Sequence, residues 1–242
     1  MENIKKLAEI LKNSKYAVFF GGAGTSTDSG IKDFRGKDGL YKTDWRGYRP
    51  EEILSIDFFV SHRELFNEYV AEKMSIENVK PNKGHAALVE LEKMGILKTI
   101  ITQNIDNLHQ DAGSGRVLEL HGTLKDWYCL SCGKRADHNF TCDCGGVVRP
   151  RVTLYGEMLD DRVTSEAIAE IRKADTLLIA GTSLTVYPAA YYIRYFEGKN
   201  LVIINADSTQ YDADASLVIH DNFSNVMEAA VNEIRAMENE AK

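Results

Sequence analysis

GAGTSTDSGIKDFR, at residues 22–35, is the stretch that decides the fold and the first functional expectation. It follows the apolar, β-prone run YAVFF at 16–20, which predicts a turn at the end of a strand. Glycines let the backbone turn tightly and bring its N–H groups close to an anion, so the stretch predicts a phosphate-binding turn. Asp33, Phe34 and Arg35 follow the glycines closely in the sequence, where an ordinary dinucleotide motif would continue into a long helix. We therefore expect a dinucleotide that is reacted upon as well as held.

Further short runs rich in branched residues predict more strands, at 99–102, 176–179, 201–204 and 217–219. Helical patterns lie between or after them, at 84–94, 163–173, 188–195 and 225–237. Short apolar strands that alternate with helices predict an α/β fold, a Rossmann-like parallel sheet with helices on both faces. Ligands of such sheets bind at the carboxyl ends of the strands. Glycine or polar residues stand at four of these ends: Gly21 and Gly22, Gln103 and Asn104, Gly181 and Thr182, and Asn205.

Two segments break this alternation. Residues 36–80 are polar and aromatic, and residues 124–150 carry all four cysteines of the chain. We expect both to be insertions that pack together as a small helical and zinc-binding domain. The dinucleotide-binding domain would then consist of residues 1–35, 81–123 and 151–242.

The composition narrows the class of protein. The chain has 242 residues, 44% of them hydrophobic and 27% charged, which fits a globular chain with one large domain and a modest insertion. Its formal net charge of −7 argues against general nucleic-acid binding, which needs a basic surface. No apolar run approaches the roughly 18 residues of a membrane span. The first residues, MENIKKLAEILKN, are too charged for a secretory signal and predict an amphipathic helix. We expect a cytoplasmic monomer without a nucleic-acid or membrane partner.

The cysteines form two close pairs, Cys129 with Cys132 and Cys142 with Cys144. Four thiolates from two knuckles satisfy tetrahedral zinc completely, and such a closed site leaves no position for water. The spacing therefore predicts one structural Zn²⁺. The alternatives are four reduced cysteines without a metal, or a disulfide, which is uncommon in a cytosolic chain. A zinc ribbon that binds nucleic acid is a further alternative, which the lack of a clearly basic segment disfavours.

Polar side chains gather in ITQNIDNLH, at 101–109, where a strand hands over to a loop. Gln103, Asn104 and Asp106 suit ribose hydroxyls and a carboxamide, although Asn and Asp also favour turns for local reasons. His121 leaves the apolar stretch 118–120 just before a glycine. An unperturbed pKa of about 6.5 makes a histidine there a plausible general base, and a structural histidine is the alternative. In PNKGH, at 81–85, a helix start with its cap is expected.

Taken together, these pieces resemble the sirtuins, the NAD-dependent protein lysine deacylases. Each motif alone is weak, but their joint order is specific and covers nearly the whole chain. The matching pieces are GAGTS at 22–26, SGIKDFR at 29–35, TQNIDNLH at 102–109, HG at 121–122, the two cysteine pairs, RP at 149–150, YGE at 155–157, GTSL at 181–184 and VIIN at 202–205.

The resemblance implies a role for each matching position. The implied catalytic residues are His121, as the general base, with Asn104 and Asp106. The implied NAD-binding residues are Gly22, Ala23, Gly24, Thr27, Ile31, Asp33, Phe34, Arg35, Gln103, Ile105, Asp106, His121, Gly181, Thr182, Ser183, Asn205 and Phe223. Among them, Ile31 and Asp33, helped by Ile105 and Asp106, would meet the nicotinamide carboxamide, and Thr182, Ser183 and Asn205 would hold the adenosine half. The implied cofactors are NAD and one structural zinc ion remote from the reaction.

For the substrate, the resemblance implies an acyl-lysine protein or peptide. The acyl-lysine tunnel would run past Phe34, Tyr155 and Val186. The peptide would pair as an added strand between the segment near Gly156 and Glu157 and the one near 184–186. In the implied reaction the acyl oxygen attacks the ribose as nicotinamide leaves, and the acyl group passes to ADP-ribose. The rival functions are mono-ADP-ribosyl transfer to a protein and an NAD-sensing module without turnover. A dehydrogenase is disfavoured, because no acidic residue follows the glycine turn at the usual distance.

The chain departs from the family pattern at a few positions. Lys32 replaces the usual proline, which removes a fixed φ and predicts weaker NAD binding. Tyr155 replaces the usual phenylalanine and Thr153 a common valine, so the acyl site should be slightly more polar. Sirtuins that remove succinyl groups carry a Tyr-x-x-Arg pair, whereas here Tyr69 is followed by Glu72. An acid there would repel a dicarboxylic acyl chain, which predicts acetyl or another neutral group.

Overall fold

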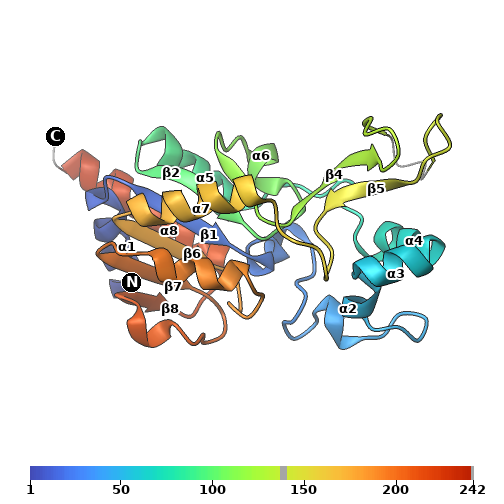
Figure 1. Cartoon of the computed structure of the whole chain (residues 1–242). Helices are drawn as coiled ribbons and strands as arrows, with labels where there is room; N and C mark the ends of the chain where they lie inside the picture. Colours follow the sequence, from blue (N-terminus) through green and yellow to red (C-terminus); the bar gives the residue numbers. More distant parts are fainter. Residues whose placement is uncertain (137–140, 241–242) are drawn as a thin grey trace.

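The core of the protein is one sheet of six parallel strands in the order β3-β2-β1-β6-β7-β8 (Figure 1). This computed structural model describes residues 1–136 and 141–240, so residues 137–140 of the second insertion and 241–242 lie outside the description. The strands are β1 (Ala17–Gly21), β2 (Leu97–Thr102), β3 (Val117–Glu119), β6 (Thr176–Ala180), β7 (Asn200–Ile204) and β8 (Leu217–Ile219). Strand order reverses at β1, which lies between β2 and β6. The parallel sheet confirms the predicted fold class.

Each face of the sheet packs against its own helices. On one face lie α1 (Glu2–Asn13), α5 (Lys83–Lys93) and α8 (Phe223–Glu240), and on the other lie α7 (Asp161–Lys173) and the 3₁₀ segment η4 (Ala189–Tyr195). Successive side chains of a strand point to opposite faces, so Phe19 joins the first core while Val18 and Phe20 join the second. The short helix α6 (Leu108–Ala112) packs against α5.

The helix expected at 188–195 is the tighter η4, not an α-helix. Its sequence AAYYIRY is rich in aromatic residues, which lose side-chain freedom in an α-helix. By contrast, the start of α5 is as expected, because the Asn82 side chain accepts hydrogen bonds from the backbone of Gly84 and His85. Within the part of the chain that the structure describes, no helix has both the length and the apolar character to span a bilayer.

The two insertions form a smaller unit beside the sheet (Figure 1). The first supplies η3 (Leu40–Lys42), α2 (Pro50–Ile53), α3 (Ile56–Ser61) and α4 (Arg63–Lys73). The second supplies most of the antiparallel strands β4 (Gly122–Cys129) and β5 (Val148–Val152) and the segment that joins them. A third core joins them, in which Phe58, Phe66 and Tyr69 share one cluster with Trp127 and Val148. These strands were not predicted, because their sequences GTLKDWYC and VRPRV are too polar to stand out.

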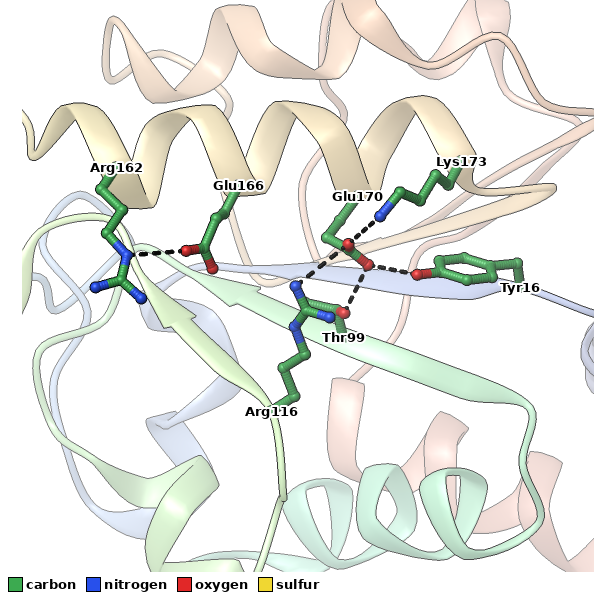
Figure 2. Close-up of polar contacts among 7 residues, drawn as sticks. All are labelled: Tyr16, Thr99, Arg116, Arg162, Glu166, Glu170 and Lys173. Carbon is green, nitrogen blue, oxygen red and sulfur yellow. Dashed lines mark hydrogen bonds and ion pairs between the residues drawn. The ribbon is translucent and has the colours of Figure 1, made fainter.

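A buried carboxylate fastens α7 to the sheet (Figure 2). The Glu170 side chain is 1% exposed, and its oxygens accept hydrogen bonds from the Tyr16 hydroxyl at 2.7 Å and the Thr99 hydroxyl at 2.9 Å. Lys173 donates at 2.8 Å and Arg116 at 3.3 Å. Burial alone would raise the pKa of Glu170, but the hydrogen bonds from Lys173, Tyr16 and Thr99 outweigh it and lower the pKa. The carboxylate therefore stays charged and ties one helix to the strands beneath it.

Candidate functional site

The main cavity, of about 430 Å³, opens at the carboxyl edge of the sheet beside the point where strand order reverses. Its lining includes Gly22, Gln103, Gly181 and Asn205, the residues that directly follow β1, β2, β6 and β7. The prediction that these strand ends meet at one site is therefore confirmed. Such a position is the usual ligand site of an open parallel sheet.

The glycine-rich turn packs backbone to backbone against the turn after β6. The Gly24 N–H donates to the Gly181 carbonyl at 2.8 Å, and the Gly22 N–H donates to the Ala180 carbonyl at 3.1 Å. Gly181 has a φ of 62°, and a Cβ there would collide with the backbone nitrogen of Thr25. Only glycine fits this approach without strain. Two 3₁₀ turns follow, η1 (Ala23–Thr25) and η2 (Thr27–Ser29), in place of a long helix.

Asn104 and Asp106 belong to a hydrogen-bond network beneath this turn. The Asn104 amide donates to the hydroxyls of Thr25 and Ser26, both at 3.1 Å. The Asp106 carboxylate, 6% exposed, accepts from the Ser26 hydroxyl at 2.7 Å and the Leu108 N–H at 2.9 Å. Burial raises the pKa of Asp106, and these hydrogen bonds oppose the rise. Both side chains therefore have the turn contacts that we considered as an alternative, and both also line a cavity.

His121 lies on the wall of the main cavity. Its Nδ1 is 2.9 Å from the Gln103 carbonyl oxygen, which can only accept, so Nδ1 carries the proton and Nε2 keeps its lone pair. Burial lowers the pKa of His121, and the contact with Gln103 opposes the shift. The Gln103 side chain in turn donates to the Thr182 hydroxyl at 3.0 Å. An imidazole that is neutral near pH 7 and fixed through one nitrogen can accept a proton at the other.

Three polar side chains meet across the cavity. The Arg35 guanidinium donates to the Tyr155 hydroxyl at 3.3 Å, and the Tyr41 hydroxyl lies 3.1 Å from that same oxygen. The Arg35 guanidinium also lies 5.1 Å from the centre of the Tyr41 ring, whose other neighbour is Phe34. Burial, followed by the contact with Tyr155, raises the pKa of Tyr41, so the Tyr41 hydroxyl stays protonated near neutral pH.

The segment that carries Tyr155 is braced by a bidentate ion pair. Arg149, 4% exposed, donates to the two Glu157 oxygens at 2.7 and 2.9 Å, and the Leu154 N–H donates to the same carboxylate at 2.8 Å. Burial raises the pKa of Glu157, but the contacts with Arg149 and Leu154 outweigh it and lower the pKa. The Glu157 side chain is thus engaged within the protein, although Gly156 and Glu157 line the cavity.

A second cavity of about 290 Å³ adjoins the first. The two have Ala23, Phe34, Met74, Asn104 and Ile105 in common. Ile31 and Asp106 line only the second, whereas the other residues predicted to bind NAD or substrate line the first. The structure therefore brings together all the predicted residues of the reaction site.

Several lining residues were missed by the sequence analysis, among them Tyr41, Met74, Tyr187 and Asn222. Asn222 follows β8, so the strand-end argument applied to the last strand would have found it. Tyr41, Met74 and Tyr187 stand in no motif that the analysis used.

The argument from Tyr69 and Glu72 does not hold. Tyr69 is fully buried in the third core against Trp45, with ring centres 5.5 Å apart, and it lines neither cavity. Glu72 accepts a hydrogen bond from the Trp45 indole at 3.1 Å and lines only the second cavity. The two side chains therefore do not face one acyl chain together, and the predicted preference for a neutral acyl group loses its support.

The four cysteines meet as the spacing predicted, with all sulfur atoms within 4.8 Å of one another. The Sγ atoms of Cys129 and Cys144 are 3.5 Å apart, and those of Cys132 and Cys142 are 3.7 Å apart. Four sulfurs at the usual Zn–S distance in a tetrahedron would be about 3.8 Å apart. All four are free thiols, which removes the disulfide alternative. The donor set fits one structural zinc ion, at the far end of β4 from His121.

Comparison with known proteins gives consistent matches. The profile of the Sir2 family matches residues 22–188. An NAD-dependent protein deacetylase of Fusobacterium nucleatum is 68% identical over 238 residues, which are 98% of this chain and 94% of the relative. A protein of the same name from Clostridium acetobutylicum is 48% identical over 242 residues, covering 96% of this chain and 99% of the relative.

Solved structures agree. A Sir2 enzyme structure at 42% identity superposes with a TM-score of 0.87, covering 98% of this chain and 99% of that one. A Sir2 structure with a deacetylated p53 peptide and 3′-O-acetyl ADP-ribose has a TM-score of 0.87 at 35% identity, covering 95% of this chain and 98% of that one. A third, a Sir2 homologue with NAD, has a TM-score of 0.86 at 38% identity, covering 96% and 94%.

Proposed function

The chain belongs to the Sir2 family and is an NAD-dependent protein deacetylase, and we propose that His121 is its general base, with Asn104 and Asp106 beside it. The observation that carries the proposal is the hydrogen bond from His121 Nδ1 to Gln103 in the wall of the main cavity. It leaves Nε2 free to take a proton from a ribose hydroxyl. No protein nucleophile is needed in this reaction.

Bound NAD supplies the ADP-ribosyl group that accepts the acyl group, with release of nicotinamide. We assign its diphosphate to the glycine-rich turn, where small residues let an anion approach the backbone closely. The Gly22 and Gly24 N–H groups already donate to the end of β6 and its turn, so Ala23 is the residue of this turn whose N–H would meet the diphosphate. Thr182, Ser183 and Asn205, at the ends of β6 and β7, would hold the adenosine half. The second cavity, lined by Ile31 and Asp106, would take the nicotinamide.

The acyl-lysine would enter the main cavity past Phe34, Tyr155 and Val186, all on its wall. The Glu157 carboxylate is engaged by Arg149, so Glu157 would meet the peptide through its backbone. An added strand recognised by main-chain hydrogen bonds fits a deacetylase that accepts many proteins.

We propose the domain boundaries of the sequence analysis unchanged. Residues 1–35, 81–123 and 151–242 would form the NAD-binding domain, and residues 36–80 and 124–150 the small domain. The third core supports this division, because it draws on both insertions, although Leu154 joins it from beyond the second. The zinc ion would hold the two knuckles of the small domain together and take no part in the reaction.

We also propose that the enzyme acts in the cytoplasm as a monomer, without nucleic-acid or membrane partners. Four reduced cysteines suit a reducing compartment, and a net charge of −7 disfavours nucleic acid. Light scattering would measure the mass in solution.

The test combines mass spectrometry with one variant. With NAD and an acetyl-lysine peptide, the protein should release nicotinamide and form O-acetyl-ADP-ribose. His121→Ala should lower the rate at least about 100-fold while ADP-ribose still binds, because removal of a general base leaves the cavity intact. An ADP-ribosylated protein as the main product would favour the transferase alternative, and an active His121→Ala would exclude the assigned base.

A further inference from the structure

The loop at residues 33–42 is a compact unit that carries Arg35 and Tyr41 over the main cavity. The Gly36 N–H donates to the Asp33 carboxylate at 2.8 Å, which closes the first turn of the loop. The Tyr41 N–H donates to the Phe34 carbonyl at 2.9 Å, which brings the two ends together. Arg35 and Tyr41 therefore lie side by side on one hydrogen-bonded loop.

Tyr155 lies across the cavity from this loop, on a segment held by backbone hydrogen bonds. Its backbone N–H donates to the Leu54 carbonyl at 2.9 Å, and its carbonyl accepts from the Ile56 N–H at 2.9 Å. The ion pair between Arg149 and Glu157 braces the residues that follow. The backbone of Tyr155 is thus held on both sides, and its hydroxyl reaches from a rigid segment to the loop.

The Tyr155 hydroxyl is the point where the two sides meet. It accepts from Arg35 at 3.3 Å and shares a hydrogen bond with Tyr41 at 3.1 Å. Arg35 has five N–H donors in a planar fork, so the contact with Tyr155 leaves most of them for an anion. The usual phenylalanine of the family could make neither contact. This chain therefore has a polar link across the cavity that the family pattern lacks.

We propose that Tyr155 is a positioning residue, which holds Arg35 and the 33–42 loop ready for the diphosphate of the cofactor. The inference rests on the proposed function only in taking NAD as the anion. The contacts join protein groups to one another, so they order part of the loop independently of the anion and lower the cost of binding it. The same link offsets the freedom that Lys32 gives the loop in place of proline.

The test is calorimetric binding of ADP-ribose to the full chain and to Tyr155→Phe. The variant should bind ADP-ribose about two- to tenfold more weakly, the range for the loss of one ordinary hydrogen bond. Because Tyr155 also lines the assigned acyl-lysine path, kcat and the KM for the acetyl-lysine peptide are measured in parallel, and the loss of ADP-ribose affinity should be the same whichever acyl chain the peptide carries. Tyr187→Phe is the matched control, because Tyr187 lines the same cavity and its hydroxyl makes no hydrogen bond to the described residues.

A second variant, Tyr41→Phe, tests whether Tyr41 and Tyr155 act through their shared hydrogen bond or independently of each other. Tyr41→Phe should weaken ADP-ribose binding in the wild-type background but change it little in Tyr155→Phe, because the shared contact is already lost. Unchanged ADP-ribose binding in Tyr155→Phe, or a loss confined to peptide KM and dependent on acyl-chain length, would overturn the proposal. If the wild-type protein bound ADP-ribose but did not deacetylate the peptide, the proposed function would be contradicted. The calorimetric comparison of wild type with Tyr155→Phe would still be valid.

Discussion

Two buried histidines should make the protein unstable in mild acid. His85 and His109 lie with ring centres 4.8 Å apart, packed against Phe223 and Phe19. His109 is 1% exposed, and neither of its ring nitrogens has a hydrogen-bond partner among the described residues. Burial lowers the pKa of His85 to about 4. Burial, followed by the charge of His85, lowers the pKa of His109 to about 3.

The direction of the effect follows from proton binding. An unfolded histidine titrates near pH 6.5, above either folded value, so the unfolded chain binds more protons as the pH falls. The stability from keeping each ring neutral is complete above about pH 6.5 and is lost progressively below it. At pH 5, about 1.5 units below the unfolded pKa, each buried ring has lost about 2 kcal/mol of this stabilisation.

His109→Leu removes one of these titrations together with two unpartnered nitrogens. Urea unfolding followed by circular dichroism at pH 8 and pH 5 gives the free energy of unfolding at each pH. The variant should lose about 2 kcal/mol less than the wild type between the two. Glu119, whose pKa burial raises to about 6, titrates in the opposite direction in both proteins and cancels in the comparison.

The control is His62→Leu, which changes an exposed histidine of the small domain. Its loss of stability between pH 8 and pH 5 should equal that of the wild type. If His109→Leu lost as much stability as the wild type, the burial of a neutral ring at 109 would not be the source of the acid sensitivity. His109→Met, with a side chain of similar volume, repeats the measurement in a second background.

Three further predictions concern other parts of the molecule. A zinc chelator, or Cys132→Ser, should lower the melting temperature through the small domain, while ADP-ribose binding by the sheet persists. Glu170→Gln should lower the free energy of unfolding by about 1–3 kcal/mol, measured in urea, because Arg116 and Lys173 lose their buried partner. The specificity constant kcat/KM should decrease only when the pH falls below about 6.5, because burial lowers the pKa of His121 and the neutral ring is the active form.

The sheet and the position of the site were predictable because both depend on local pattern. Each predicted apolar run, three to five residues long, became a parallel strand, and the residues that follow four of these runs met at one edge. The cluster of four sulfur atoms was likewise predictable, because the cysteines form two pairs that are each close in sequence. In these cases a short stretch of sequence contains the physical cause of the structure.

Contacts between distant side chains were beyond the sequence analysis. Nothing near Tyr155 indicates that its hydroxyl reaches Arg35, because the rotation of two separate segments decides the distance. The argument from Tyr69 and Glu72 failed for the same reason, since spacing along a helix does not say which face meets the third core. Glu170 was also missed, because three of its partners, Tyr16, Thr99 and Arg116, come from separate parts of the chain.

The three apolar cores have no buried side chain in common among the described residues. The main cavity opens between them, with Leu54 and Leu154 of the third core on one side and Ile204 and Phe223 of the first on the other. The wall of the cavity is therefore formed where separately packed cores meet, not by a hole within any one of them. Two reactants can share this space without displacing a side chain from any of the three interiors.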